Sequence, residues 1–157
     1  MIHLRRKTCL YRLADRSDAS AIFKMCRDFH QETQFNNIVF DDVVFAGHLS
    51  WLYDDDSCFL AVAEHDGKVV GFMSGWVYQL YFSKTLSAQN NLWYVSPEHR
   101  GGMIGVRLLK MFESWAFDKG AKILVGGTSS GISMPRSNEL IEHFGYEPVG
   151  SQYRKVL

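Results

Sequence analysis

Cysteine and proline are scarce in this chain, and its charges cancel. Among 157 residues there are three cysteines and three prolines. Cys9, Cys26 and Cys58 are widely spaced and form no C-x-x-C pair, which argues against a disulfide framework and a zinc site. The six histidines show no H-E-x-x-H or paired spacing, so we expect no metal. The cysteines are expected to be small buried apolar residues in a reducing compartment.

The chain also lacks an excess of charge and a long apolar run. Seventeen basic and 17 acidic residues give zero net charge, so the broad positive field of a nucleic-acid-binding protein is missing. The basic run at 5–7 is interpreted as a solvated arm. No apolar run approaches the ~20 residues of a membrane-spanning helix, and no signal-peptide pattern is present. We therefore expect a soluble, cytoplasmic protein with no membrane or nucleic-acid partner.

What the chain does contain is alternating strand and helix patterns in one continuous domain, residues 1–157. The 46% hydrophobic and 14% aromatic content predicts a well-filled core. Helices are predicted after an N-cap at Ser17, after Asp41 or Asp42, from the glycine-rich turn to Gly120, and over 137–144. Strands are predicted over 8–13, 58–64, 68–78, 86–95, 121–125 and 147–156. This order is typical of an α/β protein with a mixed sheet.

The most informative stretch runs from Leu92 to Val106, where a strand ends, a glycine-rich turn follows and a helix begins. It reads L-W-Y-V-S-P-E-H-R-G-G-M-I-G-V. Backbone amides at such a helix start favour a phosphate or pyrophosphate, and Arg100 adds a positive charge. A P-loop is excluded because Val-Arg follows Gly105, and the glycine spacing is not that of a dinucleotide fingerprint. Taken alone, the pattern is equally explained by a turn that binds nothing.

This stretch resembles the acetyl-CoA motif of the GNAT superfamily of N-acetyltransferases, V-x-P-x-x-R-G-x-G-x-G. The matching positions are Val95, Pro97, Arg100, Gly101 and Gly105. Three further segments are similar to the family in order and spacing: 11–19, the hairpin at 66–72 and the closing helix and strand at 140–149. The resemblance implies the GNAT fold, with a mixed central sheet of about six strands, four helices and a splay at the cofactor strand.

The resemblance also implies an activity, the transfer of an acetyl group from acetyl-CoA to a primary amine of a small molecule or protein. Strand residues would border the pantetheine arm, with the Val95 N–H polarising the thioester carbonyl, and the turn would hold the pyrophosphate. The cofactor-binding residues expected on this basis are Trp93, Tyr94, Val95, Arg100, Gly101, Gly102, Met103, Ile104, Gly105 and Val106.

The chain departs from the family at three places. Met103 replaces the second motif glycine, and Ile141 stands where many members have a tyrosine that protonates the thiolate. No carboxylate occupies Gln89–Asn91 or Gly126-Gly127, where the family often has its basic glutamate. The usual acid and base are thus missing, although holding an amine close to a thioester contributes several kcal/mol by itself.

Other side chains remain as catalytic and acceptor-binding candidates. Asn91 could end a water chain that carries the proton outward, and Tyr146 or His143 could serve as the acid. The resemblance implies that the segment joining the first two helices walls the acceptor pocket. Glu32 and Phe35 in that segment would suit an ammonium group. Asp41 and Asp42 are equally explained as helix caps, and the acidic run at 54–56 as a solvated loop.

Two other classes of function are weighed against the enzyme. The missing acid and base fit a non-catalytic CoA-binding or acyl-CoA-binding module that acts through protein contacts. The segment 127–131 matches the G-x-S-x-G nucleophile pattern around Ser129. A serine hydrolase is disfavoured because no aspartate follows Asp118, which leaves only glutamates as the acid, and because the chain is short for a hydrolase sheet. The C-terminal end at 149–156 is a candidate homodimer contact by the same resemblance.

Overall fold

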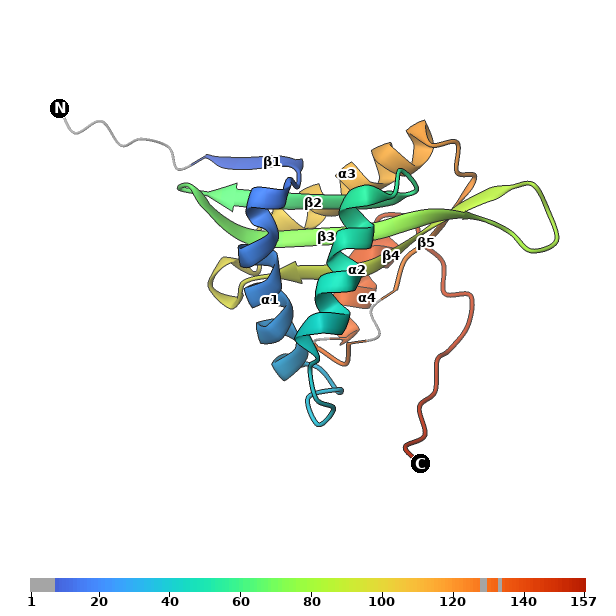
Figure 1. Cartoon of the computed structure of the whole chain (residues 1–157). Coiled ribbons are helices and arrows are strands. Elements are labelled where there is room, and N and C mark those ends of the chain that lie inside the picture. Colours follow the sequence, from blue (N-terminus) through green and yellow to red (C-terminus); the bar gives the residue numbers. More distant parts are fainter. Residues whose placement is uncertain (1–7, 128–129, 133) are drawn as a thin grey trace.

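A five-stranded sheet forms the centre of the computed structural model, which describes residues 8–127, 130–132 and 134–157 (Figure 1). Neighbouring strands follow the chain order, and each pair is antiparallel except the last, β4 with β5, which is parallel. The basic run at 5–7 and Ser129 lie outside the described residues. The strands are β1 (Cys9–Leu13), β2 (Cys58–His65), β3 (Lys68–Gln79), β4 (Leu86–Val95) and β5 (Ile123–Val125).

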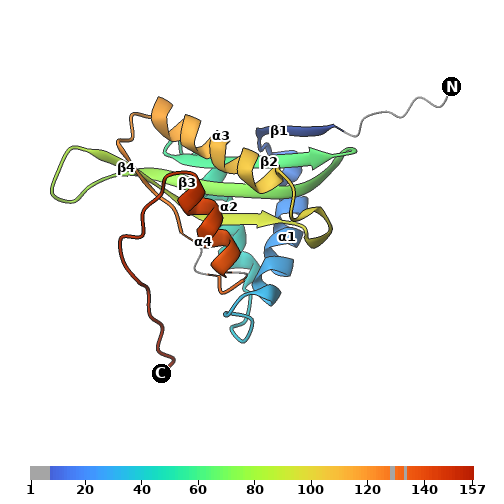
Figure 2. The same ribbon diagram turned by 180° about the vertical axis from the view of Figure 1, so that it is seen from behind.

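Helices cover both faces of this sheet. The pair α1 (Ala19–Glu32) and α2 (Asp42–Asp54) lies on the face turned to the viewer in Figure 1, and α3 (Ile104–Asp118) and α4 (Met134–His143) lie on the other (Figure 2). Two short 3-10 turns, η1 (Arg16–Asp18) and η2 (Pro97–His99), precede α1 and α3. The α/β class, the mixed sheet and the four helices predicted from the sequence are thus confirmed.

The core has two halves, one on each face of the sheet, and β2 contributes to both. Its side chains point alternately to opposite faces, so Phe59 and Ala61 pack toward α3 while Leu60 and Val62 pack toward α1 and α2. All four are buried. Burial on both faces explains why β2 reads as a continuous apolar run rather than as an alternating pattern.

Local signals in the sequence place several chain reversals correctly. Asp66 and Gly67 have φ of 50° and 77°, which is the backbone of the predicted tight hairpin between β2 and β3. Gly120 follows α3 with φ of 85°, as a helix-ending glycine does. The Asp41 carboxylate accepts hydrogen bonds from the amides of Val43 and Val44 and caps α2.

Two sequence predictions are wrong. Ser17 does not cap the first helix: the Asp15 side chain accepts from the Ser17 amide and caps η1, and α1 begins at Ala19. The segment 147–156 forms no strand, so the sheet has five strands instead of about six. β5 is only three residues long, and Pro148 brings no amide for a ladder. Apolar side chains of this tail, such as Tyr153, are left exposed.

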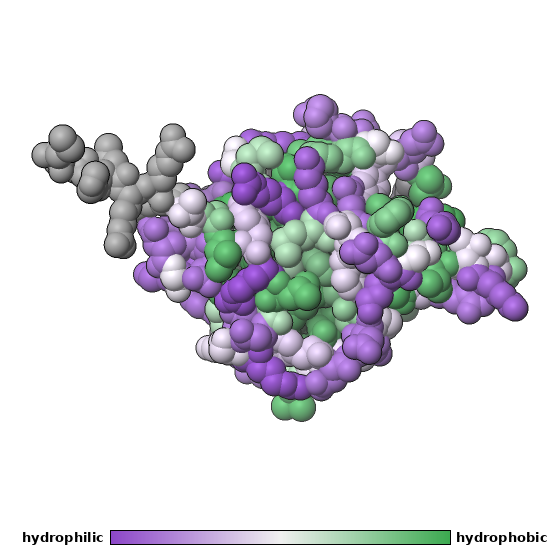
Figure 3. Space-filling view, turned by 90° about the horizontal axis from the view of Figure 1, so that it is seen from above, coloured by the Kyte–Doolittle hydropathy of each residue, from purple (hydrophilic) through white to green (hydrophobic). Residues whose placement is uncertain are grey.

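The β3–β4 hairpin extends past the helices that flank the sheet (Figure 1). Tyr81 and Phe82 near its turn are 98% and 71% exposed, and hydrophobic and hydrophilic residues mix on this projection (Figure 3). None of the helices among the described residues has the length and apolar character needed to cross a membrane.

Candidate active site

The sheet opens between β4 and β5. β5 pairs with β4 only over Ser87–Gln89, whereas β3 stays paired with β4 as far as Val95. The Ser96 amide donates to the Val70 carbonyl of β3 at 2.9 Å. Because successive backbone groups of a strand point to opposite edges, the amides of Trp93 and Val95 point to the open edge. The predicted splay at this strand is therefore present.

A buried amide side chain holds the point where the strands part. The Asn90 Oδ1 accepts from the Gly127 amide at 3.0 Å, and its Nδ2 donates to the Gly127 carbonyl at 3.4 Å. Asn90 is 8% exposed. This pair of bonds ties the segment after β5 to β4 and fixes where the opening begins.

A β-bulge lies beside the opening. Ser74 is opposite Leu92 and its neighbour Gly75 is opposite Asn90, so Asn91 is an extra residue on β4. Asn91 is exposed, and its Nδ2 lies 3.0 Å from Nε2 of His48 on α2. The bulge therefore brings a histidine from a distant part of the chain to the open strand.

The glycine-rich turn leads from β4 to α3. Gly101 has φ of 84°, and α3 starts after Met103 without any side-chain cap on its first amides. A β-carbon on Gly105 would lie 3.4 Å from Nε1 of Trp93, so the first turn of α3 packs closely on that indole. Met103 has φ of −89°, a backbone conformation that does not require glycine, and its side chain is 58% exposed. The methionine in place of the family glycine is therefore accommodated without backbone strain.

Arg100 is held by the protein rather than projecting from the turn. Its Nε donates to the Val95 carbonyl at 2.7 Å, and its two terminal nitrogens donate to the Glu32 carboxylate at 2.7 and 3.0 Å. The guanidinium lies 5.1 Å from the Tyr94 ring, and the Tyr94 hydroxyl donates to Glu32 at 2.9 Å. The hydrogen bonds from Arg100, and then that from Tyr94, hold the pKa of Glu32 below its ordinary value.

This network gives Glu32 and Tyr94, two site residues predicted from the sequence, a structural role. Both oxygens of Glu32, a candidate for binding the acceptor, already have partners from Arg100 and Tyr94. Tyr94 is buried, and burial first and Glu32 second raise the pKa of its hydroxyl. The three side chains together clamp the glycine-rich turn to the end of α1.

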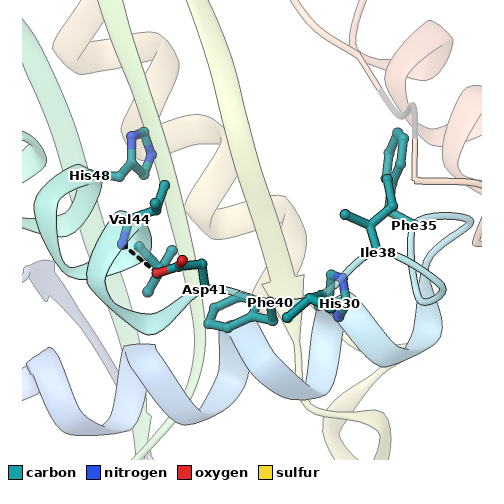
Figure 4. A pocket seen from close by; sticks show the side chains of 9 residues that line it. His30, Phe35, Ile38, Phe40, Asp41, Val44 and His48 are labelled. Atoms are coloured by element: carbon teal, nitrogen blue, oxygen red, sulfur yellow. Dashed lines mark hydrogen bonds between the residues drawn. The ribbon is translucent and has the colours of Figure 1, made fainter.

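An apolar groove of about 510 Å³ lies between the end of α1 and the start of α2 (Figure 4). Phe35, the other acceptor-binding candidate, lines it. Among the lining residues only His30, Asp41 and His48 carry a titratable side chain. The remaining lining residues are Ile38, Val39, Phe40, Val44 and Phe45.

His48 is a site residue that the sequence does not indicate. It lines the groove and also contacts β4. Its imidazole contacts Asn91 and lies 5.5 Å from the Trp51 ring and 6.3 Å from the Phe45 ring. Burial lowers the pKa of His48 below its ordinary value of 6.5, so the ring is neutral at neutral pH. Since it is 43 residues from Asn91 in the chain, only the bulge geometry reveals the contact.

The remaining catalytic candidates lie on the side of α3 and α4. A β-carbon on Gly126 would lie 2.9 Å from the Tyr146 ring, so that ring packs directly on the segment after β5. Burial first, and then the charge of Glu113, raise the pKa of Tyr146. His143 is exposed, with its ring 5.6 Å from Phe144. The part of the chain that the structure describes contains no cluster of three metal-binding side chains.

With this geometry in view, the chain belongs to the acetyltransferase (GNAT) family, whose sequence profile matches residues 21–146. None of the curated proteins matches the sequence. The family assignment agrees with the opening between β4 and β5 and with the turn that leads into α3.

Solved structures share the fold over nearly the whole chain. An aminoglycoside N-acetyltransferase, AAC(6')-Iy, in complex with CoA aligns with a TM-score of 0.80 at 15% identity, covering 98% of this chain and 99% of its own. A ribosomal-protein-alanine N-acetyltransferase from Brucella melitensis biovar Abortus aligns with a TM-score of 0.72 at 20% identity, covering 96% and 99%. A transcriptional regulator from Bacillus halodurans gives a TM-score of 0.78 at 16% identity, covering 96% and 100%. At these identities the likeness concerns the fold alone.

Proposed function

We propose that this protein is an acetyl-CoA-dependent N-acetyltransferase that modifies a primary amine of a small molecule or protein. One observation carries the proposal: the unpaired edge of β4 leads directly into the uncapped start of α3. Free strand amides and carbonyls suit an extended chain that itself bears amides, such as pantetheine. Uncapped helix amides suit a pyrophosphate.

The backbone supplies the main contacts in this proposal. Trp93 and Val95 present their amides to the open edge, and the Val95 carbonyl is already used by Arg100. The Val95 N–H lies at the edge of β4 that β5 leaves unpaired, and there it would donate to a thioester carbonyl and stabilise charge that develops on that oxygen. Bound acetyl-CoA supplies the activated acetyl group. Arg100 acts by holding the turn, together with Glu32 and Tyr94.

Tyr146 is the side chain proposed to protonate the leaving thiolate. Its ring packs on Gly126, next to the Gly127 that Asn90 holds at the strand opening. The hydroxyl carries its proton at neutral pH, as a proton donor must, although burial and then Glu113 raise its pKa and make it a weaker acid than an exposed tyrosine. The hydroxyl is buried, and it lies close enough to Glu113 for that carboxylate to act on its pKa.

The names of the structural neighbours support an amine acceptor. One acts on aminoglycosides and another on the alanine of a ribosomal protein, so the same fold serves small-molecule and protein amines. A module that binds CoA without turnover is the alternative, and it is favoured by the absence of a carboxylate at Gln89–Asn91.

The test combines thermal unfolding with an assay of thiol release. Acetyl-CoA at ~100 times its dissociation constant should stabilise the native state by about 2.7 kcal/mol, a rise of several degrees in Tm, whereas NAD should have no effect. Thiol release with an amine panel then separates the enzyme from the binding module. If acetyl-CoA leaves Tm unchanged, the proposal is wrong.

A pair of glycine variants locates the site. A β-carbon on Gly102 or on Gly150 would meet no atom within 4 Å, so leucine at either position should leave the fold intact. Gly102→Leu fills the space over the turn and should weaken acetyl-CoA binding by at least tenfold. Gly150→Leu, in the C-terminal tail, should leave binding unchanged. Equal affinities of the two variants would show that the turn does not hold the ligand.

A further inference from the structure

His48 contacts both the bulge on β4 and the apolar groove. The Asn91 side chain, on the extra residue of the β4 bulge, lies 3.0 Å from Nε2 of His48. The same imidazole forms one end of the groove between α1 and α2 (Figure 4). A molecule in the groove would therefore touch His48 next to the open part of β4.

His48 is suited to accept a proton there. The Asn91 Nδ2 can only donate, so while it lies against Nε2 the hydrogen of the neutral ring is on Nδ1. When the Asn91 amide turns so that its Oδ1 accepts from Nε2–H, the free electron pair lies on Nδ1, the ring nitrogen that remains for a ligand. Burial lowers the pKa of His48, so the ring carries a free electron pair at neutral pH. The titratable groups that share the groove are His30 and Asp41, and one Asp41 oxygen is already engaged by the first amides of α2.

We propose that His48 accepts the proton of the acceptor amine, which enters along the apolar groove. This inference rests on the proposed acetyl transfer and supplies the base that the usual positions lack. The acceptor ammonium gives one proton to Nδ1 of His48, and the freed nitrogen pair attacks the thioester carbon. The carbon–sulfur bond breaks with its electron pair on sulfur, the Tyr146 hydroxyl gives its proton to the thiolate, and the second proton from the nitrogen restores Tyr146. The products are an amide, a thiol and an imidazolium that returns its proton to water.

The groove lining also favours one class of acceptor. Apart from its two histidines and Asp41, every lining side chain is aliphatic or aromatic, including Phe35, Ile38 and Val44. A polycation such as an aminoglycoside would find a single carboxylate, already serving as a helix cap. A single amine on an apolar body would bury its carbon atoms against the lining and keep its nitrogen at His48.

The kinetic test uses 2-phenylethylamine as acceptor and kanamycin as the polycationic comparison. His48→Gln keeps a hydrogen-bonding group for Asn91 but cannot take up the proton, so kcat should fall by about a hundredfold or more. The KM for acetyl-CoA and the Tm rise it causes should stay within twofold of wild type. His65→Gln, at the end of β2 and outside the groove, is the matched control and should retain full activity. The kcat/KM for 2-phenylethylamine should exceed that for kanamycin at least tenfold.

Two further readouts separate proton transfer from packing. Wild-type kcat should rise with pH through a midpoint below 6.5, because only neutral His48 is active, and His48→Gln should lack this limb. Added 4-methylimidazole should restore part of the activity of His48→Ala. Wild-type kinetics for His48→Gln would overturn the proposal while leaving the acetyltransferase assignment intact. A reversed acceptor preference would overturn the groove assignment.

A binding measurement covers the case in which 2-phenylethylamine is not turned over. In the CoA complex, the imidazole NMR signals of His48 should shift on addition of this amine, while those of His65 stay fixed. Unchanged His48 signals would overturn the proposal even if acetyl-CoA binding, and hence the proposed function, holds. Failure of acetyl-CoA to bind wild type would instead contradict the proposed function itself.

Discussion

The ion pair between Glu32 and Arg100 should contribute measurable stability that depends on pH. Two nitrogen–oxygen contacts of 2.7 and 3.0 Å give a bidentate geometry, but the side chains are 29% and 36% exposed and solvent screens them. We therefore expect a coupling energy of about 1 kcal/mol, the upper end for exposed pairs. Urea denaturation of wild type, Glu32→Gln, Arg100→Gln and the double variant at pH 7 gives this energy as a double-mutant cycle.

The sign of the pH dependence follows from Glu32. Its pKa in the folded protein is lowered from the ordinary 4.5, so the contribution is fully present above about pH 4.5 and is lost as the pH falls through the lower folded-state value. The stability difference between wild type and Glu32→Gln should shrink accordingly in acid. Since the pair also clamps the turn, the KM for acetyl-CoA should rise in both single variants. A coupling energy near zero at pH 7, or one that is unchanged at pH 3, would refute the reasoning.

Two further outcomes are expected from backbone contacts. Gly75→Ala places a β-carbon 2.5 Å from the Gln89 carbonyl oxygen and should destabilise the protein by several kcal/mol. Gly47→Ala, at a helix position with open space, should stabilise the protein by about 0.5–1 kcal/mol. Equal denaturant midpoints for the two variants would contradict the packing at the bulge. Asn90→Ala removes two hydrogen bonds to Gly127 and should lower the free energy of unfolding by about 1–3 kcal/mol. It should also raise the KM for acetyl-CoA, because the strand opening is no longer held. An unchanged Tm would show that water replaces the amide.

The parts of the fold that could be predicted are those encoded by near neighbours in the sequence. The Asp66-Gly67 hairpin, the end of α3 at Gly120 and the cap at Asp41 each depend on one residue and its own backbone geometry. The glycine-rich turn belongs to the same group, since its consecutive positions form both the motif and the helix start. Such features need no knowledge of the rest of the chain.

The Ser17 cap failed for a local reason, since its neighbour Asp15 is the capping residue. The predicted C-terminal strand and the site contacts that were missed depend on distant parts of the chain. Residues 147–156 read as a strand, but a strand needs a partner edge, and their apolar side chains find none in the monomer. Glu32 reads as a free carboxylate, yet Arg100 reaches it from 68 residues away. His48 reads as an ordinary helix residue, and its meeting with Asn91 depends on a bulge whose position no local pattern indicates.

The bulge on β4 also allows this segment to lose one residue without losing its register. A bulge sets two residues of one strand against one of its partner, so removal of the extra residue restores a regular ladder. Deleting Asn91 would leave Gly75 opposite Asn90 and Ser74 opposite Leu92, and the Trp93 and Tyr94 side chains would keep their faces toward Gly105 and Glu32. What the deletion removes is local: the residue that contacts His48 and the bend that a bulge gives its strand.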